Sequence, residues 1–513
     1  MDVASPNATA IAIAGGKIIA VGDDKTVRAL GRPSTREIAL AGKTVTPGLI
    51  DAHCHLYGLG VDLESVSVRA LPSEAETVRV VAEAAKTRAA TEWLVGRGWD
   101  QNRWPGQAFP TKAALDAAIS DRPVLLRRVD GHAFWVNSKA LAAANITAET
   151  KDPAGGKILR DATGQPTGVL IDNATDLVEA VVPAATPEMI ERRIRAAAQR
   201  AVSVGLTGVH DMGISEDTAQ VYRKLAADNQ LALRVYAYLA GNSNRLAQVR
   251  AAPAADVGRF AMRGVKSFAD GALGSRGARL YEPYDDDKAN KGLWVTEPEQ
   301  LRIVVEAAVA SGWQVAVHAI GDAAVGSVLD AYQAAQRKHG GDRRLRIEHL
   351  QIVADEDWPR LIDSKAIASM QPTHATSDMP WAEQRIGAVR IKGAYAWRTV
   401  LDKGVPLANG SDFPVEDVPP LLGIYAAVTR QDPSGAPAAG WYPDQRMTLD
   451  EAIAGFTRGA AYAEFSDTTR GTIAVGRAAD LTVYDRKLTA DRSLLETRAA
   501  WTIVGGQVVF EAK

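Results

Sequence analysis

The sequence has very little cysteine: Cys54 is the only one in 513 residues. An internal disulfide is therefore excluded, which fits a reducing compartment. No stretch approaches the roughly 20 apolar residues of a membrane-spanning helix, and the N-terminus lacks the basic and then apolar pattern of a secretory signal. The sequence as given predicts a cytoplasmic protein, although an exported protein whose leader had been removed would look the same.

An excess of one charge is also lacking, because 59 Lys and Arg residues stand against 61 Asp and Glu, for a net charge of −2. The basic residues are scattered, so neither nucleic acid nor an anionic membrane is an expected partner. A content of 46% hydrophobic and 23% charged residues is typical of a globular enzyme rather than a disordered chain. We expect a small-molecule substrate, and a homo-oligomer remains open.

The eight histidines of the sequence are few, and several of them close short apolar runs. His53 and His55 end TVTPGLIDAHCH, and alternate residues of a strand share a face, so the two rings should converge. Converging imidazoles are a start on a divalent metal site. Lys266 lies inside RGVKSF, where a lone buried ammonium would be costly. His318, His349 and Asp412 likewise stand at the ends of short apolar runs.

Short apolar runs alternate with alanine-rich helical stretches such as EMIERRIRAAAQRAVSVG, a pattern typical of βα units and a parallel sheet. Eight such runs predict an α/β fold, a (β/α)8 barrel, with its active site at the C-terminal strand ends. The candidate strands are Val45–Asp51, Thr207–Asp211, Leu233–Leu239, Gly264–Phe268, Gln314–His318, Leu345–His349, Ala366–Gln371 and Pro406–Ala408.

The two ends of the chain have a different pattern. TAIAIA and KIIAVG, joined by Gly15-Gly16, predict a β-hairpin, and the C-terminal segment again shows short β-rich runs punctuated by glycine. We predict one small composite β-sandwich domain from residues 1–44 and 470–513, with the barrel spanning 45–469.

Residues 57–187 separate the first barrel strand from the second and do not fit a minimal barrel. We interpret them as an insertion that covers the barrel mouth and shapes the substrate pocket. The alternative is a plain packing subdomain. The aromatic residues that would line such a pocket are Trp93, Trp99, Trp104, Phe134 and Trp135.

Motifs along nearly the whole chain resemble the amidohydrolase superfamily of metal-dependent hydrolases. They are most similar to its N-substituted formamide deformylase-like branch, amidohydrolase family 3. The motifs that carry this resemblance are PGLIDAHCH, DGHAFWVNSKAL, GQPTGVLID, GVKSFADGALGSR, VAVHAIGD, RIEHLQ, MQPTHATSDMPWA, GAYAWR and NGSDFPVE. They are specific for fold and metal chemistry and weakly specific for substrate.

The resemblance implies two divalent ions per chain, Zn²⁺ or another divalent metal. His53, His55 and Asp412 would bind the more buried ion, and His318 and His349 would bind the second. Lys266 would bridge the two as a carboxylated lysine. Its alternative is an uncarboxylated lysine that pairs with Asp270 or binds substrate, and Glu348 could orient His349 or replace it as a ligand.

A metal pair activates water and polarises a substrate carbonyl. Asp412 is placed to take a proton from that water and pass it to the leaving amine, as general base and then general acid. His132 and His374 are candidate donors to the developing oxyanion, or hydrogen-bonded structural histidines.

Other polar residues could support the site. Asp51, Asp211, Asp270 and Asp322 are candidates to accept the second N–H of a ligating histidine. The candidate substrate-binding residues are Trp99, Trp135, Asp270, Arg276 and His210. Arg276 could instead anchor its own loop, and His210 could lie behind the ligands.

The leading hypothesis is therefore a metal-dependent hydrolase of a non-peptide carbon–nitrogen bond in an amide, N-acyl or N-formyl group. A cyclic amide or ester hydrolase would use the same centre. A catalytically silent metal- or ligand-binding barrel is the alternative of another class, although such a protein would not need the base at Asp412.

Overall fold

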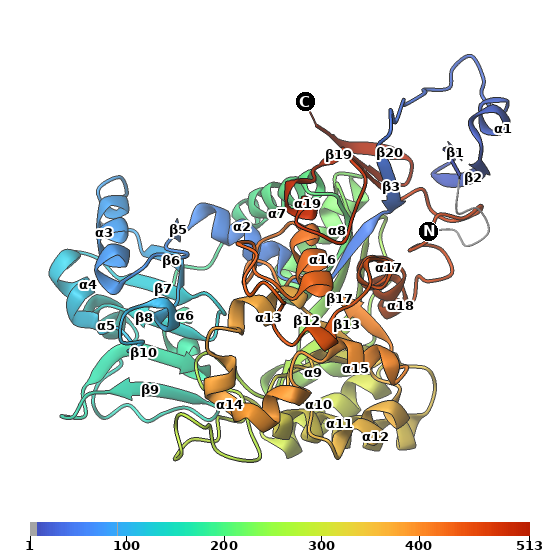
Figure 1. Ribbon diagram of the computed structural model, residues 1–513. Helices are drawn as coiled ribbons and strands as arrows, with labels where there is room; N and C mark the ends of the chain where they lie inside the picture. Colours follow the sequence, from blue (N-terminus) through green and yellow to red (C-terminus); the bar gives the residue numbers. More distant parts are fainter. Residues whose placement is uncertain (1–7, 90, 513) are drawn as a thin grey trace.

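The protein is built on an eight-stranded parallel barrel at its centre (Figure 1), as seen in a computed structural model that describes residues 8–89 and 91–512. The strand order is β17-β16-β15-β14-β13-β12-β11-β4. This confirms the predicted fold. Along the chain the strands are β4 (Leu49–Cys54), β11 (Leu206–Ile214), β12 (Arg234–Ala240), β13 (Phe260–Phe268), β14 (Gln314–Ala319), β15 (Arg346–His349), β16 (Ile367–Met370) and β17 (Leu407–Asn409).

The barrel closes through the segment that follows β17. Among the described residues no strand ladder joins β17 to β4. Instead Asp412 N–H donates to the His53 carbonyl at 2.7 Å, and His55 N–H donates to the Phe413 carbonyl at 2.8 Å. A Cβ on Gly410 would lie 2.4 Å from the His53 nitrogen, so only glycine allows this approach. Closure thus brings Asp412 beside both histidines.

The outer helices pack apolar faces against the barrel. In α7 (Pro187–Ser203) the Thr186 side chain caps Met189 N–H and proline occupies the first turn. Buried residues recur at helical spacing from Ile190 through Ile194 to Ala201. The other helices along the barrel are α2 (Leu56–Glu64), α8 (Glu216–Ala227), α9 (Leu246–Arg250), α10 (Pro298–Ala310), α11 (Asp322–His339), α12 (Asp357–Ser364), α13 (Pro372–Asp378), α14 (Ala382–Arg390), α15 (Trp397–Asp402), α16 (Pro420–Thr429), α17 (Leu449–Ala454) and α18 (Ala460–Ala463).

The insertion after β4 is a separate layer beside the barrel, on the left in Figure 1. Its sheet has the order β5-β6-β7-β8-β10-β9 and its own hydrophobic core, which contains Trp99, Trp104 and Trp135. Its strands are β5 (Val66–Ser67), β6 (Leu94–Trp99), β7 (Val124–Arg128), β8 (Ala133–Val136), β9 (Gly156–Arg160) and β10 (Pro166–Asp172). Its helices are α3 (Glu74–Ala85), α4 (Lys112–Ala118), α5 (Ser138–Ala143) and α6 (Asp176–Glu179).

The two chain ends meet in antiparallel sheets at the upper right of Figure 1. The predicted hairpin is β1 (Ala10–Ala14) with β2 (Lys17–Gly22), and Ile18 N–H donates to the Arg477 carbonyl at 2.9 Å. A second sheet has the order β20-β19-β18-β3. Its strands are β3 (Thr44–Pro47), β18 (Leu481–Tyr484), β19 (Ala499–Val504) and β20 (Gln507–Glu511). The short helix α1 (Asp24–Arg28) lies between β2 and β3, and α19 (Ser493–Glu496) lies between β18 and β19.

The predicted strand Val45–Asp51 is in fact two strands. Its first half, β3, pairs with β18, and its second half, β4, begins the barrel at Leu49. The break falls at Gly48, where a Cβ would lie 2.4 Å from Thr207 Oγ1. Apolar residues stand on both sides of this point, and the Pro47-Gly48 pair was the available signal for the change of sheet.

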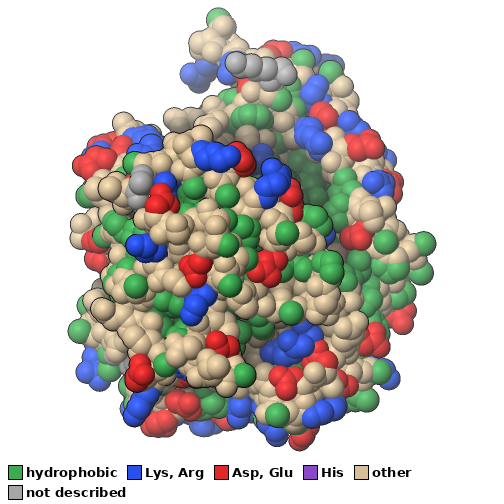
Figure 2. Space-filling view, turned by 90° about the vertical axis from the view of Figure 1, so that its left-hand side faces the viewer, with side chains coloured by type: hydrophobic (Ala, Val, Ile, Leu, Met, Phe, Trp, Pro, Cys, Tyr) green, Lys and Arg blue, Asp and Glu red, His purple; other side chains and the backbone are tan. Residues whose placement is uncertain are grey.

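Figure 2 shows the face on the insertion side, where Lys and Arg side chains are interspersed with Asp and Glu. The surface is hollowed in its upper part, and hydrophobic side chains are visible in the hollow. Within the described ranges, no helix has the length and apolar character needed to cross a membrane.

Candidate metal centre

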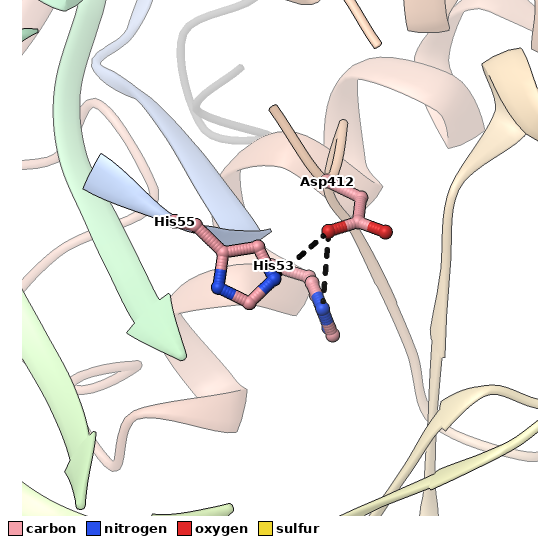
Figure 3. A group of neighbouring side chains, drawn as sticks. All are labelled: His53, His55 and Asp412. Atoms are coloured by element: carbon pink, nitrogen blue, oxygen red, sulfur yellow. Dashed lines mark ion pairs between the residues drawn. The ribbon is translucent and has the colours of Figure 1, made fainter. Parts of the chain in front are cut away.

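The first half of the centre lies where β4 ends. His53 and His55 project toward the carboxylate of Asp412, which stands after β17 (Figure 3). Oδ1 of Asp412 lies 3.5 Å from Nε2 of His53 and 3.2 Å from Nε2 of His55. His55 Nδ1 donates to the Met212 carbonyl at 2.9 Å, which leaves its Nε2 free to act as a ligand. The predicted convergence of the two rings on one point is therefore present.

The second half of the centre comes from the next strands around the barrel. His349 lies with its ring centroid 4.5 Å from that of His318 and 4.9 Å from that of His53. Its Nδ1 is hydrogen-bonded to Oε1 of Gln371 at 2.8 Å. His374, at the start of α13, has its Nε2 3.7 Å from Oδ2 of Asp412.

Two groups of side chains could each hold an ion. His53, His55 and Asp412 form one, and His349, His374 and Asp412 form the other, with ligand atoms within 4.8 Å of one another in each. Asp412 belongs to both groups, because its Oδ1 lies near His53 and His55 and its Oδ2 lies near His374. His318, predicted as a ligand of the second ion, adjoins His349 but lies outside these groups, and its Nε2 is 3.3 Å from the Gly271 carbonyl.

Lys266 lies on β13 and is 1% exposed. Its Nζ has no hydrogen-bond partner among the described residues and sits 4.8 Å from the centre of the Phe268 ring. Burial lowers its pKa to about 8. A buried amine that loses its proton easily is the form needed for carboxylation, so the residue suits the bridging role that the resemblance implies.

The alternative partner of Lys266, Asp270, is occupied elsewhere. Its carboxylate accepts backbone N–H bonds from Ile320 at 3.0 Å, Gly321 at 2.8 Å and Arg279 at 2.8 Å. It therefore holds the loops after β13 and β14 together, and its Oδ1 also lies 3.6 Å from Nε2 of His318.

Several converging polar atoms are left without partners, and this is the observation that fits a metal. His53 Nε2, His374 Nε2, Asp412 Oδ1 and Lys266 Nζ are buried and unbonded among the residues that the structure describes. Each such orphaned group costs about 1–3 kcal/mol. A divalent ion with nitrogen and oxygen ligands would satisfy several of them at once.

The charges of the centre also suit a cation. Burial lowers the pKa of His53 to about 4, so its ring is neutral, as a ligand must be. Burial acts to raise the pKa of Asp412, but His53 and His55 hold it well below the usual value, so the carboxylate stays ionised.

The insertion contributes one more histidine. His132, between β7 and β8, has its ring centroid 5.0 Å from that of His318, and its Nδ1 is 2.7 Å from Oδ1 of Asp172. Burial opposes its charge, but the hydrogen bond and charge of Asp172 raise the pKa of His132. An imidazole that is 17% exposed and held by Asp172 is thus presented beside the centre.

A family model described as the amidohydrolase family matches residues 36–510. The chain belongs to the amidohydrolase family. Protein YtcJ of Bacillus subtilis is 37% identical over 94% of this chain and 92% of its own length. N-substituted formamide deformylase of Arthrobacter pascens is 29% identical over 100% of this chain and 96% of its own length.

A solved structure of an uncharacterized metal-dependent hydrolase from Pyrococcus furiosus has a TM-score of 0.72 and 30% identity, covering 93% of this chain and 95% of that one. The resemblance found in the sequence is thereby confirmed. With the His and Asp groups described above, the chain is an amidohydrolase-family metal-dependent hydrolase.

Trp99 and Trp135 lie in the core of the insertion, whereas the contacts of His210 and Arg276 fit the alternatives that the sequence leaves open for them. Trp99 and Trp135 are 0% exposed in the core of the insertion, where their indole N–H groups donate to the carbonyls of Leu126 and Thr111. Both side chains therefore pack in the core of the insertion and do not line a substrate pocket. His210 is also 0% exposed and faces the barrel interior, and Arg276 pairs with Asp286 at 3.0 Å.

The partners of the histidine rings differ from those expected. Glu348 contacts Nδ1 of His53 at 2.5 Å, whereas it was predicted to serve its neighbour His349. Adjacent residues of a strand point to opposite faces, so alternation alone argued against that pair. Asp51 accepts from Ser411 at 2.6 Å, and Asp211 from Tyr222 at 2.6 Å, so neither binds a ring.

Gln371, the partner of His349, was not singled out from the sequence at all. It follows β16 and precedes Pro372, so its place at a strand end was the available signal. The fourth candidate carboxylate, Asp322, accepts from Tyr281 N–H at 2.9 Å rather than from a histidine.

Proposed function

We propose that the chain hydrolyses a carbon–nitrogen bond outside a peptide chain, in an amide, N-acyl or N-formyl group of a small molecule. The observation that carries this proposal is the shared carboxylate of Asp412 between two groups of metal-type ligands. The likeness to N-substituted formamide deformylase over the whole chain supports an amide-type substrate.

The residues present fit two divalent ions. His53, His55 and Asp412 would hold the first, and His349 with His318 or His374 would hold the second, with Lys266 between them. Zn²⁺ is the ion proposed, since imidazole and carboxylate ligands suit it. Bound there, the ions supply activation of water and polarisation of the substrate carbonyl.

Asp412 moves the proton. Its Oδ1 faces His53 and His55 and its Oδ2 faces His374, so an ionised oxygen is available in the middle of the centre. It takes a proton from the attacking water and returns it to the leaving nitrogen. Transfer to the nitrogen is the step that lets the amine leave.

His132 would stabilise the charge that develops on the carbonyl oxygen, and so would His374 if His318 is the ligand of the second ion. His132 is held by Asp172 from the insertion side, and His374 stacks on His349 with ring centroids 5.6 Å apart. Donors fixed before the reaction lower the barrier without reorganisation at the moment of reaction.

The test is turnover of a small panel containing N-formyl amines, N-acyl amines, cyclic amides and esters. The protein is measured as purified, after removal of metal by a chelator, and after Zn²⁺ is restored. We expect amine release from at least one open-chain amide, lost with the metal and regained with Zn²⁺. Hydrolysis of esters alone would contradict the carbon–nitrogen assignment, and hydrolysis of cyclic amides alone would contradict the open-chain substrate. Zn²⁺ binding with no turnover of any class would indicate a silent barrel.

A further inference from the structure

A polar layer fills the barrel directly beneath the histidines, where branched apolar side chains usually pack. Its centre is Arg346 on β15, which is 0% exposed. The guanidinium binds groups from four other strands. These are the Ala52 carbonyl on β4 at 2.5 Å, His210 Nδ1 on β11 at 2.7 Å, the Tyr238 hydroxyl on β12 at 2.9 Å and the Ser369 hydroxyl on β16 at 2.8 Å.

Arg346 also forms an ion pair with Glu348, two residues further along the same strand. Its Nε lies 2.8 Å from Oε1 and its Nη2 lies 3.1 Å from Oε2, so both carboxylate oxygens are held by one planar fork. Such bidentate pairing fixes the plane of a carboxylate as well as its position. Glu348 is 0% exposed, so these bonds are shielded from bulk solvent.

The held carboxylate then acts on His53. Oε2 of Glu348, the oxygen bound by Arg346 Nη2, also meets His53 Nδ1 at 2.5 Å. A carboxylate that is ion-paired with an arginine accepts hydrogen bonds, so Nδ1 of His53 donates to it. The other ring nitrogen of His53, Nε2, therefore carries the lone pair. Nε2 is the atom that faces Asp412 and lacks a partner among the described residues.

We propose that Arg346 is a positioning residue for the metal centre, which acts through Glu348 to set the orientation and tautomer of His53. This inference rests on the proposed role of His53 as a metal ligand. Arg346 touches neither substrate nor metal. Because it is hydrogen-bonded to four other strands, it fixes the position of the His53 ring relative to the barrel as a whole.

Lysine cannot replace this arginine. An ammonium is a point charge with three donors on a flexible stem, whereas the guanidinium has five donors in a rigid plane. Arg346→Lys should therefore keep the charge and lose the fork. Arg430→Lys is the matched control, because Arg430 is also 0% exposed and, among the described residues, its hydrogen bonds go to the carbonyls of Trp441 and Tyr395.

The experiment measures Zn²⁺ affinity by competition with a chromogenic chelator, with folding checked by circular dichroism and the thermal midpoint. We expect Arg346→Lys to weaken Zn²⁺ binding about 10–100-fold, as is usual when the partner of a ligating histidine is lost. Arg430→Lys should lower the thermal midpoint and leave Zn²⁺ affinity unchanged. Equal affinity in wild type and Arg346→Lys would overturn the proposal.

A double-mutant cycle identifies the route. If Arg346 acts through Glu348, then Arg346→Lys combined with Glu348→Gln should weaken Zn²⁺ binding no more than the stronger single change. Additive losses would overturn the route through Glu348. If Arg346→Lys fails to fold, Ser369→Ala is the substitute, because it removes only one hydrogen bond of Arg346. This variant should still weaken Zn²⁺ binding measurably. Unchanged Zn²⁺ affinity in Ser369→Ala would refute the inference. A wild-type chain that binds no Zn²⁺ would instead refute the proposed function.

Discussion

At the scale of single residues, Asp412 joins metal binding to proton transfer. Asp412→Asn keeps the shape and one neutral oxygen ligand but cannot accept a proton near neutral pH. We therefore expect most of the metal to be retained while turnover falls by about 10²–10⁴-fold, the usual worth of general acid–base help. The measurement is bound metal by elemental analysis and turnover on the same preparation.

His318→Asn is the comparison for that variant, because it removes an imidazole near the second group and keeps a polar side chain. Metal occupancy and turnover should fall together there. Near-normal turnover in Asp412→Asn would remove Asp412 from the mechanism and leave His374 or His132 as the base.

Lys266 is the second residue whose replacement separates hypotheses. Lys266→Ala should abolish most activity by removing the bridging group, and short carboxylic acids such as acetate should restore part of it by occupying the gap. The gap is enclosed, since Lys266 is 1% exposed. Full activity of the variant without added acid would show that no carboxylated lysine is needed.

At the scale of elements, α17 begins with a complete capping box. Thr448 accepts from Glu451 N–H at 3.3 Å, and Glu451 accepts from Thr448 N–H at 2.8 Å. Glu451 is also paired with Arg398 of α15. The hydrogen bond from Arg398 is the main reason that the pKa of Glu451 falls from about 4.5 to about 2.

Glu451→Gln retains the capping geometry and removes the charge. The carboxylate with a depressed pKa stabilises the fold above pH about 4.5, and this contribution is lost as the pH falls toward 2. We expect the variant to be less stable by about 0.5–1 kcal/mol at pH 7, after allowance for solvent screening. The measurement is the difference in thermal midpoint between wild type and Glu451→Gln, which should be smaller at pH 3 than at pH 7. An equal difference at both pH values would contradict the electrostatic account.

At the scale of the whole molecule, the insertion is fastened to the barrel by a chain of polar contacts. Asn102 of the insertion donates to the Gly274 carbonyl at 3.3 Å and accepts from Arg385 Nη2 of α14 at 2.9 Å. Arg385 also pairs with Asp286 in the loop that follows β13. Since His132 and Asp172 belong to the insertion, this attachment fixes His132 relative to the barrel histidines.

Asn102→Ala should loosen that attachment. We expect a higher KM and a lower kcat with metal content unchanged, together with faster limited proteolysis of the insertion, because the ions are held by barrel residues. Lys139→Ala, exposed on α5 of the same insertion, is the control and should change none of these. A loss of metal in Asn102→Ala would show that the insertion also supports the ions.

The sequence by itself determined the barrel, its eight strands and the residues gathered at one end. The physical reason is local: apolar periodicity marks each strand, and parallel strands bring their C-terminal ends to one edge. His53, His318 and His349 could therefore be placed together without knowledge of any contact. The amidohydrolase family followed from motifs that are likewise short and local.

Only the tertiary structure decided which groups touch. Glu348 binds His53 across 295 residues of sequence, and Asp412 reaches both histidines of β4 through the closure of the barrel. Trp99 and Trp135 belong to a region that we predict to cover the barrel mouth, but packing of the insertion sheet places both in its core. Such pairings depend on strand tilt, closure and packing between distant segments, and no periodicity in the sequence records them.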